Sequence, residues 1–548
     1  MKFIYFLFAM FLVSISLQAQ FKPVFDSNRS LNENIYLSPQ ISTSGVFRYS
    51  DIFVDPDKTS LPDSNKSLSP DINKTDTAIT TFPAITKSSS HDSLKYNMYG
   101  DLLNDDPNYT PLTPIWKPAV QIVIQEVLLN LVDHYVMHFD WATVGFNSWN
   151  RTVLHSGWPW GNGWEWDNAR FGNDFLLHPY TGASYFNAAR AGGYTYWESS
   201  IFVFGGSYLW KLFGENGGAL YRPAKNSLIA TTLGGMVMGE GLYRLGSDVI
   251  DERTTGVERV SRELLAFIIS PGRSFSRFLS GKLFDHTTED VYQTEPLNIT
   301  FAPGYHRVNK GTAIEKGTNS LNLTIDLDYG NPFEKRDRKP FDYYKVSSDL
   351  DFGVGRKIAD QLTGYGILYG SNIQNGSIES LAGIFQHMDY YDNNTFELGT
   401  FAFGPGIISK LPISNNSSLY TNLHVSIVPF GALSNRFGPD TTQIGDFDFE
   451  SGAQMSLECT YNIGGWVGLT FSGYYWWLHT IHGTAGNSYI GLIKPRIAFK
   501  IFDIMSIGFE QLVYYSDRYP RDFTSVHSVR TEEKVFFQLF IEQFKLKN

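Results

Sequence analysis

The chain is poor in cysteine and has no excess of basic charge. Cys459 is the one cysteine among 548 residues, so the chain cannot form a disulfide within itself. The 55 Asp and Glu residues outnumber the 44 Lys and Arg residues, and a formal net charge of −11 argues against a phosphate-binding surface for nucleic acid. The sequence also lacks a phosphate-binding loop, a dinucleotide fingerprint and a G-x-S-x-G nucleophile motif. We therefore predict no nucleic-acid partner and no cofactor.

The first residues have the features of an export signal. Met1 and Lys2 precede an apolar stretch from Phe3 to Leu17, which ends close to the small residue Ala19. This pattern predicts a cleaved signal peptide over residues 1–20, because a retained membrane anchor needs about 20 apolar residues. Residues 21–110 are rich in Ser, Asn, Asp, Thr and Pro, and they are predicted to form a disordered linker.

The last 250 or so residues repeat a strict alternation of apolar and polar side chains. In one run, five apolar residues share one phase: Leu321, Leu323, Ile325, Leu327 and Tyr329. The polar residues between them take the other phase: Asn322, Thr324, Asp326 and Asp328. A strand presents alternate residues to opposite faces, so this is a sheet with one apolar and one polar face. Behind an export signal, the pattern predicts an antiparallel outer-membrane β-barrel of about twelve strands over residues 295–544, apolar toward lipid and polar toward the lumen.

Three further features of this region agree with a barrel. Aromatic residues pair at strand ends and suit the membrane interface: Tyr343-Tyr344, Tyr390-Tyr391, Tyr474–Trp477 and Tyr514-Tyr515. The final run, Val535 to Phe544, resembles the aromatic closing strand that barrel assembly machinery recognises. The register also predicts a polar, partly plugged lumen with these charged residues facing inward: Asp448, Glu450, Glu458, Lys494, Arg496 and Lys500. A soluble β-sandwich, whose strands also alternate, is the rival interpretation.

Residues 111–285 are predicted to form a helical segment rich in Trp and Gly. The expected helices are Pro118–Phe139, Ser199–Phe213, Ser227–Leu245 and one that begins at Thr255 and ends before Pro271. Thr255 and Glu258 have the spacing of a capping box. Gly235 and Gly239 lie four residues apart, which lets another backbone approach closely. We expect these helices to fold against the barrel. The barrel lumen, the barrel rim or the bilayer surface must cover their remaining apolar surface, and the lumen or the rim is favoured.

A set of spaced residues in this segment carries a family resemblance. It comprises Trp166-Asp167, Asn173, His178-Pro179, Gly182, Tyr185, Ala189-Arg190, Gly193, Gly206-Ser207, Trp210, Glu215, Pro223, Ser227, Gly234-Gly235 and Gly239-Glu240. The order resembles an uncharacterised bacterial envelope family, domain of unknown function 3943, over about residues 116–280. The resemblance implies a bacterial envelope protein and supplies no activity.

Ionisable residues within the apolar helices are the candidates for a site. His178, Arg190, Glu198 and Glu240 either form structural pairs or line a catalytic or transport cavity, since unpaired charges are costly to bury. His134 and His138, four residues apart on one helix, offer a metal-site alternative to an ordinary polar face.

The favoured function is a non-enzymatic outer-membrane barrel, structural or channel-like, with helices that fill or cap it. The alternative is a membrane-embedded lipid-modifying enzyme whose site lies in the helical segment. Outer-membrane lipid and the barrel assembly machinery are the expected partners, and the oligomeric state is not predicted.

Overall fold

The computed structural model describes residues 113–157, 163–167, 171–216, 222–284, 286, 295–310, 313–336, 338–353, 357–392, 397–434 and 447–542. The predicted signal peptide (1–20) and linker (21–110) lie outside these residues, as does Phe544 of the predicted closing strand.

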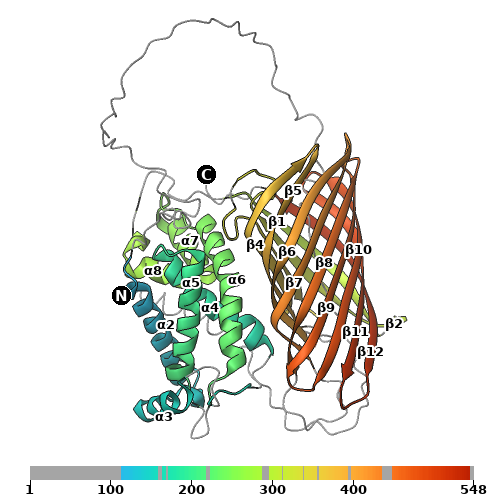
Figure 1. Cartoon of the computed structure of the whole chain (residues 1–548). Coiled ribbons are helices and arrows are strands. Elements are labelled where there is room, and N and C mark those ends of the chain that lie inside the picture. The colour runs from blue at the N-terminus through green and yellow to red at the C-terminus, as the bar shows by residue number, and fades with distance from the viewer. Residues whose placement is uncertain are drawn as a thin grey trace, which may run out of the picture.

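The C-terminal half forms a closed barrel of twelve antiparallel strands (Figure 1). The strands are β1 (Leu297–Lys310), β2 (Ala313–Tyr329), β3 (Tyr344–Asp351), β4 (Ala359–Asn375), β5 (Ile378–Asp392), β6 (Glu397–Ser414), β7 (Ser417–Ser434), β8 (Phe447–Ile463), β9 (Val467–His482), β10 (Gly486–Phe502), β11 (Met505–Pro520) and β12 (Val526–Ile541). Each strand pairs with its sequence neighbours, and β1 pairs with β12 from Ile299↔Ile541 to Val308↔Glu532. The predicted fold class and strand number are confirmed.

The predicted register of the strands is also correct. On β2, Leu321 is 61% exposed on the outer face, while its neighbour Asn322 is buried in the lumen. Asp448, Glu450 and Glu458 of β8 are likewise buried, as their polar phase predicts. A charged side chain on a lipid-facing wall is destabilising. The alternation of charged and apolar residues therefore indicates which face points into the lumen.

The prediction that adjacent aromatic pairs form interfacial girdles is wrong for one ring of each pair, and it stays a prediction for the other. Trp476 is 1% exposed within the lumen, whereas Trp477 is 43% exposed on the outer face. Tyr514 and Tyr515 divide in the same way, with Tyr514 fully buried. Consecutive residues of a strand point to opposite faces, so one ring of each such pair fills the lumen.

The two ends of the barrel differ in how the strands are joined. At the end where β1 begins and β12 finishes, four connections are tight turns, between β4 and β5, β6 and β7, β8 and β9, and β10 and β11. Gly376 and Gly464 have positive φ values of 62° and 59° in two of these turns. The first end also holds the long β2–β3 connection. Most connections at the opposite end are longer than these turns, including the one from Ser434 to Phe447, but the β1–β2 connection there is short. We call the first end the turn end and the second the loop end.

The N-terminal half of the described chain is helical. Its helices are α2 (Trp116–Tyr135), α3 (Phe146–Ser156), α4 (His178–Ala191), α5 (Tyr196–Leu209), α6 (Lys225–Val249), α7 (Gly256–Ile269) and α8 (Pro271–Leu279). Single π-helical turns precede α4 (Asn173–Leu177) and follow α5 (Trp210–Gly214). Among the described residues, no helix combines the length and the apolar character needed to cross a membrane.

Sequence patterns found α2, α5, α6 and α7 but missed α3, α4 and α8. Helix α4 is rich in Ala and has a Pro in its first turn, and it buries small residues around most of its surface, so it lacks an apolar stripe to reveal it. The capping box predicted at Thr255 is wrong, because Glu258 instead pairs with Arg262 at 2.8 Å. A capping box forms at α5, where Glu198 accepts hydrogen bonds from the Thr195 backbone and hydroxyl.

The helical segment stands beside the barrel, against its outer wall (Figure 1). Phe175 stacks on Phe401 of β6 and Phe430 of β7, with ring centroids 5.5 and 5.8 Å apart. Trp166 contacts Phe449 of β8 at 5.0 Å, at the loop end. The expectation that the helices enter the lumen or cap the rim is therefore wrong. The barrel's own side chains pack inside the lumen, and the helices pack against aromatic rings on the outer face of the barrel.

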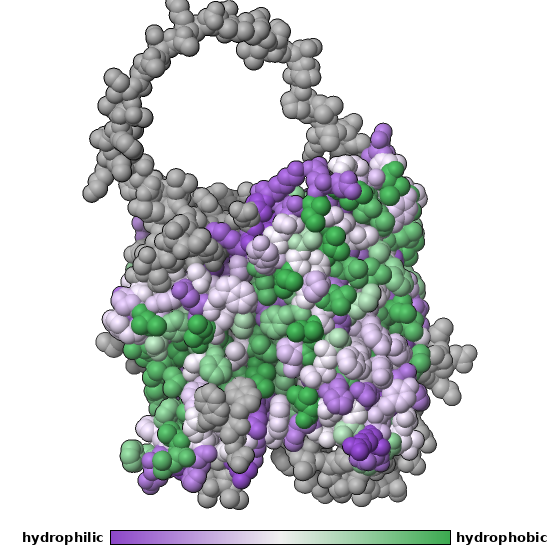
Figure 2. All heavy atoms as spheres, viewed as in Figure 1, coloured by the Kyte–Doolittle hydropathy of each residue, from purple (hydrophilic) through white to green (hydrophobic). Residues whose placement is uncertain are grey.

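The helices are held together by close backbone contacts. Gly235 of α6 lies against Gly182 of α4, where an added Cβ would stand 2.7 Å from the Gly182 Cα. Gly239, one turn later, is covered by the ring of Phe186. This confirms that Gly235 and Gly239 permit a close helix approach. Figure 2 shows hydrophobic residues both on the helical side and on the barrel side of the same face.

Candidate functional site

Apolar side chains cross the barrel lumen toward its loop end. They form a cluster that we call the lumen plug: Tyr391, Leu398, Ala402, Val428, Leu433, Trp476, Leu478, Ile490, Leu492, Leu512 and Tyr514. These residues come from β5, β6, β7, β9, β10 and β11, so the plug joins opposite sides of the wall. Trp476 and Tyr391 meet edge to face at 5.9 Å. The plug leaves this level of the lumen packed with side chains.

A second apolar cluster lies in the lumen toward the turn end. Tyr343, Ile367, Leu381, Phe385 and Ile408 form it, and Phe333 from the β2–β3 connection packs against it. The lumen is thus narrowed at two levels.

A polar cavity lies between these two apolar levels. Its lining includes Asp326, Asp328, Lys345, Tyr365, His387, Asp389, Asn422, Glu458, Tyr474 and Trp476. Lys345 lies 3.9 Å from Asp328, and Asp389 accepts a hydrogen bond of 3.0 Å from Thr400. His387 and His424 contact each other at 3.0 Å through their ring nitrogens. This cavity holds both signs of charge, and Trp476 of the lumen plug forms part of its lining.

Charged lumen residues pair both across the lumen and between neighbouring strands. Lys534 of β12 contacts Asp349 of β3 at 2.8 Å, and Arg518 of β11 pairs with Asp448 of β8. Lys494 and Arg496 both approach Glu510, at 3.9 and 3.8 Å. Of the predicted inward charges, Asp448, Lys494 and Arg496 take part in these ion pairs, whereas Glu450 accepts a hydrogen bond of 2.9 Å from Ser488. Lys500 instead pairs with the exposed Asp503 in the β10–β11 turn.

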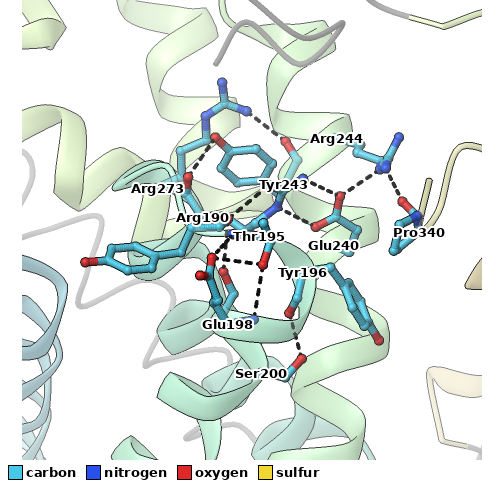
Figure 3. A network of polar contacts seen from close by, with 12 residues as sticks. Arg190, Thr195, Tyr196, Glu198, Ser200, Glu240, Tyr243, Arg244, Arg273 and Pro340 are labelled. Atoms are coloured by element: carbon cyan, nitrogen blue, oxygen red, sulfur yellow. Dashed lines mark hydrogen bonds and ion pairs between the residues drawn. The ribbon is translucent and has the colours of Figure 1, made fainter. Parts of the chain in front are cut away.

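A second polar network lies inside the helical segment (Figure 3). Arg190 of α4 donates two hydrogen bonds to Glu240 of α6, from Nε at 2.8 Å and from Nη2 at 2.9 Å. Arg244, one turn after Glu240, donates to the same carboxylate at 3.0 Å. All three side chains are fully buried. Two positive charges and one negative charge would leave an excess if the network ended here.

The remaining charge is balanced by the barrel. Arg244 also pairs with Asp342 in the β2–β3 connection at 3.4 Å and donates to the backbone oxygen of Pro340. Arg336, in the same connection, pairs with Glu295 and lies 3.7 Å from Asp342. Burial raises the pKa of Glu295, and its contact with Arg336 opposes that rise. The ion-pair network thus ties α4 and α6 to the turn end of the barrel.

The four candidate residues of the helical segment do not share one cleft. Arg190 and Glu240 pair with each other, and Glu198 caps α5 through Thr195 (Figure 3). His178 belongs to another cluster, in which its Nδ1 lies 3.1 Å from the buried Asp174. This separation into structural contacts favours a scaffold over a catalytic site.

The cluster around Asp174 was not found from the sequence. The amide of Asn226, at the start of α6, donates to Asp174 and to Asp167, at 2.8 Å in both cases. These bonds hold the π-helical turn against α6. Asp167 is part of the family pattern, but Asn226 and Asp174 carry no spacing signal that distinguishes them from ordinary polar residues.

The two candidate metal ligands lie apart from other ligand side chains. His134 contacts the Thr143 hydroxyl at 3.3 Å through Nδ1, and His138 follows the end of α2 with a positive φ of 56°. Within the part of the chain that the structure describes, no three His, Cys, Asp or Glu side chains are grouped to hold a metal ion.

In comparisons with known proteins, the helical segment matches a protein family, and the barrel resembles solved structures of other barrels. The family described as Domain of unknown function (DUF3943) matches residues 163–272, which confirms the resemblance carried by the sequence pattern. No curated protein matches the chain.

Several solved structures are similar to the barrel part. They include the NanC porin (9% identity, 44% of this chain and 98% of that chain, TM-score 0.25). An outer membrane channel from Pseudomonas putida F1 (7% identity, 45% and 96%, TM-score 0.26) and the Vibrio cholerae outer membrane protein OmpT (8% identity, 45% and 96%, TM-score 0.23) are others. At these scores the likeness carries no argument about what the chain does.

Proposed function

We propose that this chain is an outer-membrane β-barrel protein whose barrel is closed at rest and anchors the helical segment along its outer wall. The lumen plug is the observation that carries the proposal. A general diffusion pore keeps an aqueous channel through its lumen, whereas a small barrel can be filled by its own side chains. The role is therefore structural, and any solute passage would require the plug to move.

The chemistry of the outer wall supports the membrane location. Where the helices do not cover it, the wall exposes residues such as Ile427 (65%), Phe471 and Ile493, while charged residues such as Asp326 and Glu458 point inward. Such a wall is suited to acyl chains and poorly suited to water. The tight turns at one end match the periplasmic side of known barrels, and the longer connections match the outer side.

A partner is also expected during insertion of the barrel into the membrane. Strand β12 closes the barrel against β1 and carries Phe536 and Phe540. We propose that barrel assembly machinery recognises this strand.

Conductance of the purified full-length protein in planar bilayers tests the proposal, together with fractionation of the cell envelope. We expect recovery with outer membranes and no sustained conductance in the resting state. Steady ohmic conductance would overturn the closed barrel, and recovery in the soluble periplasmic fraction would overturn the location.

One observation favours a second candidate function, a lipid-modifying enzyme. Among the four candidate residues, His178 combines a carboxylate partner, Asp174, with a partly exposed side chain (25%). An imidazole held by a buried carboxylate suits general acid–base chemistry. Lipid mass spectrometry of cells that carry His178→Gln, beside a deletion strain, tests this function. A lipid change shared by both strains, at normal protein level, would support it.

A further inference from the structure

The helical segment has an unusual distribution of polar and apolar residues. In α2, the buried positions include the polar residues Gln121, Glu126 and Asp133. The exposed positions of the same helix are almost all apolar: Trp116, Val120, Val123, Ile124, Val127, Leu131 and Tyr135. A helix on the surface of a soluble protein has the opposite arrangement, with its apolar stripe toward the core.

Two neighbouring helices repeat this arrangement. Helix α5 exposes Trp197, Ile201 (71%) and Phe204, while Ser199 and Ser207 are buried. Helix α3 buries three hydroxyl side chains and exposes four large apolar ones: Phe146, Trp149, Val153 and Leu154. The outer faces of these three helices are therefore mainly apolar, and polar side chains are buried beneath them.

Several of the buried polar groups have hydrogen-bond partners inside the segment. Gln121 donates a 2.7 Å hydrogen bond to the backbone oxygen of Gly272, and Asn130 donates to the oxygens of Ala142 and Gly214. Together with the network of Arg190 and Glu240, these bonds let polar groups leave water. Hydrogen bonds of this kind, made inside the segment, are needed where the surroundings of the segment offer no hydrogen-bond partners.

The position of the segment identifies what covers its exterior. Helix α6 follows the barrel wall from the loop end, where the nearby Trp166 meets Phe449, to the turn end, where Gly241 accepts a hydrogen bond from Tyr344. Its 25 residues span about 37 Å, more than the roughly 30 Å of a bilayer's hydrocarbon core. The helices and the lipid-facing wall of the barrel therefore occupy the same level, as Figures 1 and 2 show.

We propose that the helical segment is embedded in the outer membrane beside the barrel, with the apolar faces of α2 and α5 in contact with lipid acyl chains. This proposal rests on the proposed membrane location of the barrel. The helices replace lipid along one side of the barrel and present a new lipid-facing surface in its place. Acyl chains are the occupant because the exposed apolar faces lie at the same level as the uncovered apolar wall of the barrel.

Fluorescence quenching in reconstituted liposomes of phosphatidylcholine and phosphatidylglycerol tests the proposal. The native thiol is first removed by Cys459→Ser, and single cysteines are then introduced for an environment-sensitive label. Val123→Cys probes the exposed face of α2. Ile427→Cys is the matched position on the uncovered wall of the barrel, and Asp503→Cys, at a side chain that is 97% exposed in a turn, is the matched aqueous position.

We expect the label at position 123 to be quenched by doxyl-labelled lipid and protected from iodide, as at position 427 and unlike position 503. Labels at Val120 and Leu131 should differ in depth, since eleven residues of an upright helix rise about 16 Å.

Other outcomes would overturn the inference in distinguishable ways. Iodide quenching at position 123 with lipid quenching at 427 would put the helices in water and leave the barrel in the membrane. Iodide quenching at both positions would overturn the proposed location itself. Protection from both quenchers at 123 would show that protein covers α2, either a second copy, revealed by disulfide cross-linking through Val123→Cys, or the chain's own residues 21–110, revealed by their deletion.

Discussion

Arg244 of α6 and Asp342 of the β2–β3 connection form a buried ion pair, 3.4 Å long, that joins the helical segment to the barrel. The two residues are 98 positions apart in the sequence. Arg244 also shares Glu240 with Arg190, so one network connects α4, α6 and the turn end of the barrel. Each member balances a charge that would otherwise be buried without a partner. The loss of any one member should therefore lower the stability of the protein strongly.

The first prediction concerns this network. Arg190→Met leaves Glu240 with one cationic partner, and breaking a buried pair in this way costs about 3–5 kcal/mol. We expect a clearly lower thermal midpoint for the variant in detergent, measured by tryptophan fluorescence. Arg262→Met is the control, because its partner Glu258 is largely exposed and the pair contributes about 0–1 kcal/mol. Equal midpoints for the two variants would contradict a role of the Arg190 pair in stability.

The second prediction concerns the contact between α4 and α6. Gly235→Ala places a methyl group against the backbone of Gly182, which has no flexible side chain to move aside, and overpacking of this kind costs about 1–3 kcal/mol. Gly205→Ala in α5 adds the same methyl group where nothing lies within 4 Å, and it should be neutral or stabilise by up to about 1 kcal/mol. The thermal midpoints of the two variants should move in opposite directions. A stable Gly235→Ala variant would show that the helices are packed differently.

The strands of the barrel and the orientation of their side chains could largely be predicted from the sequence. The docking of the helices on the outer wall could not. The alternation assigned Asp326 and Glu450 to the lumen. A charge on the lipid face is strongly destabilising, so the phase that holds the charged residues must face the lumen. It could not separate Phe401, which the helices cover, from Ile427, which they leave exposed. Outward apolar residues look alike in sequence whether lipid or protein meets them.

The candidate site shows the same limit. The i, i+4 spacing made the Glu240–Arg244 pair foreseeable, since residues so spaced meet on one helix face. Arg190 and Asp342 join that pair from other elements, and no local spacing points to them. Their positions follow from the way the helices dock on the barrel, which is a property of the whole fold.

The third prediction concerns the lumen plug. Trp476→Ala combined with Leu478→Ala removes two neighbouring side chains of the plug, including its one tryptophan, and should give measurable single-channel conductance in planar bilayers. Each such truncation of a buried side chain also costs about 2–5 kcal/mol, so the amount of folded barrel is checked by heat-modifiable migration on gels. Trp477→Ala is the control, since this neighbour lies on the outer face and should leave the lumen closed. A folded double variant with no conductance would place the barrier elsewhere in the lumen.

The last prediction separates the docking of the helices from the folding of the barrel. Gly399 of β6 lies under the ring of Phe175, so any side chain at this outward position meets the docked helical segment. Gly399→Leu should force the segment from the wall, because overpacking there is relieved more easily by undocking than by distorting the strand. The helices should then become sensitive to protease while the barrel keeps its heat-modifiable migration. Gly473→Leu in β9 is the matched control, since its outward position has only Phe471 nearby, at 3.8 Å. If both variants resist protease equally, the contact between Phe175 and Gly399 does not hold the segment to the barrel. If Gly399→Leu also abolishes the heat-modifiable barrel, the helices and the barrel fold as one unit, and the outer wall of β6 depends on the helices that cover it.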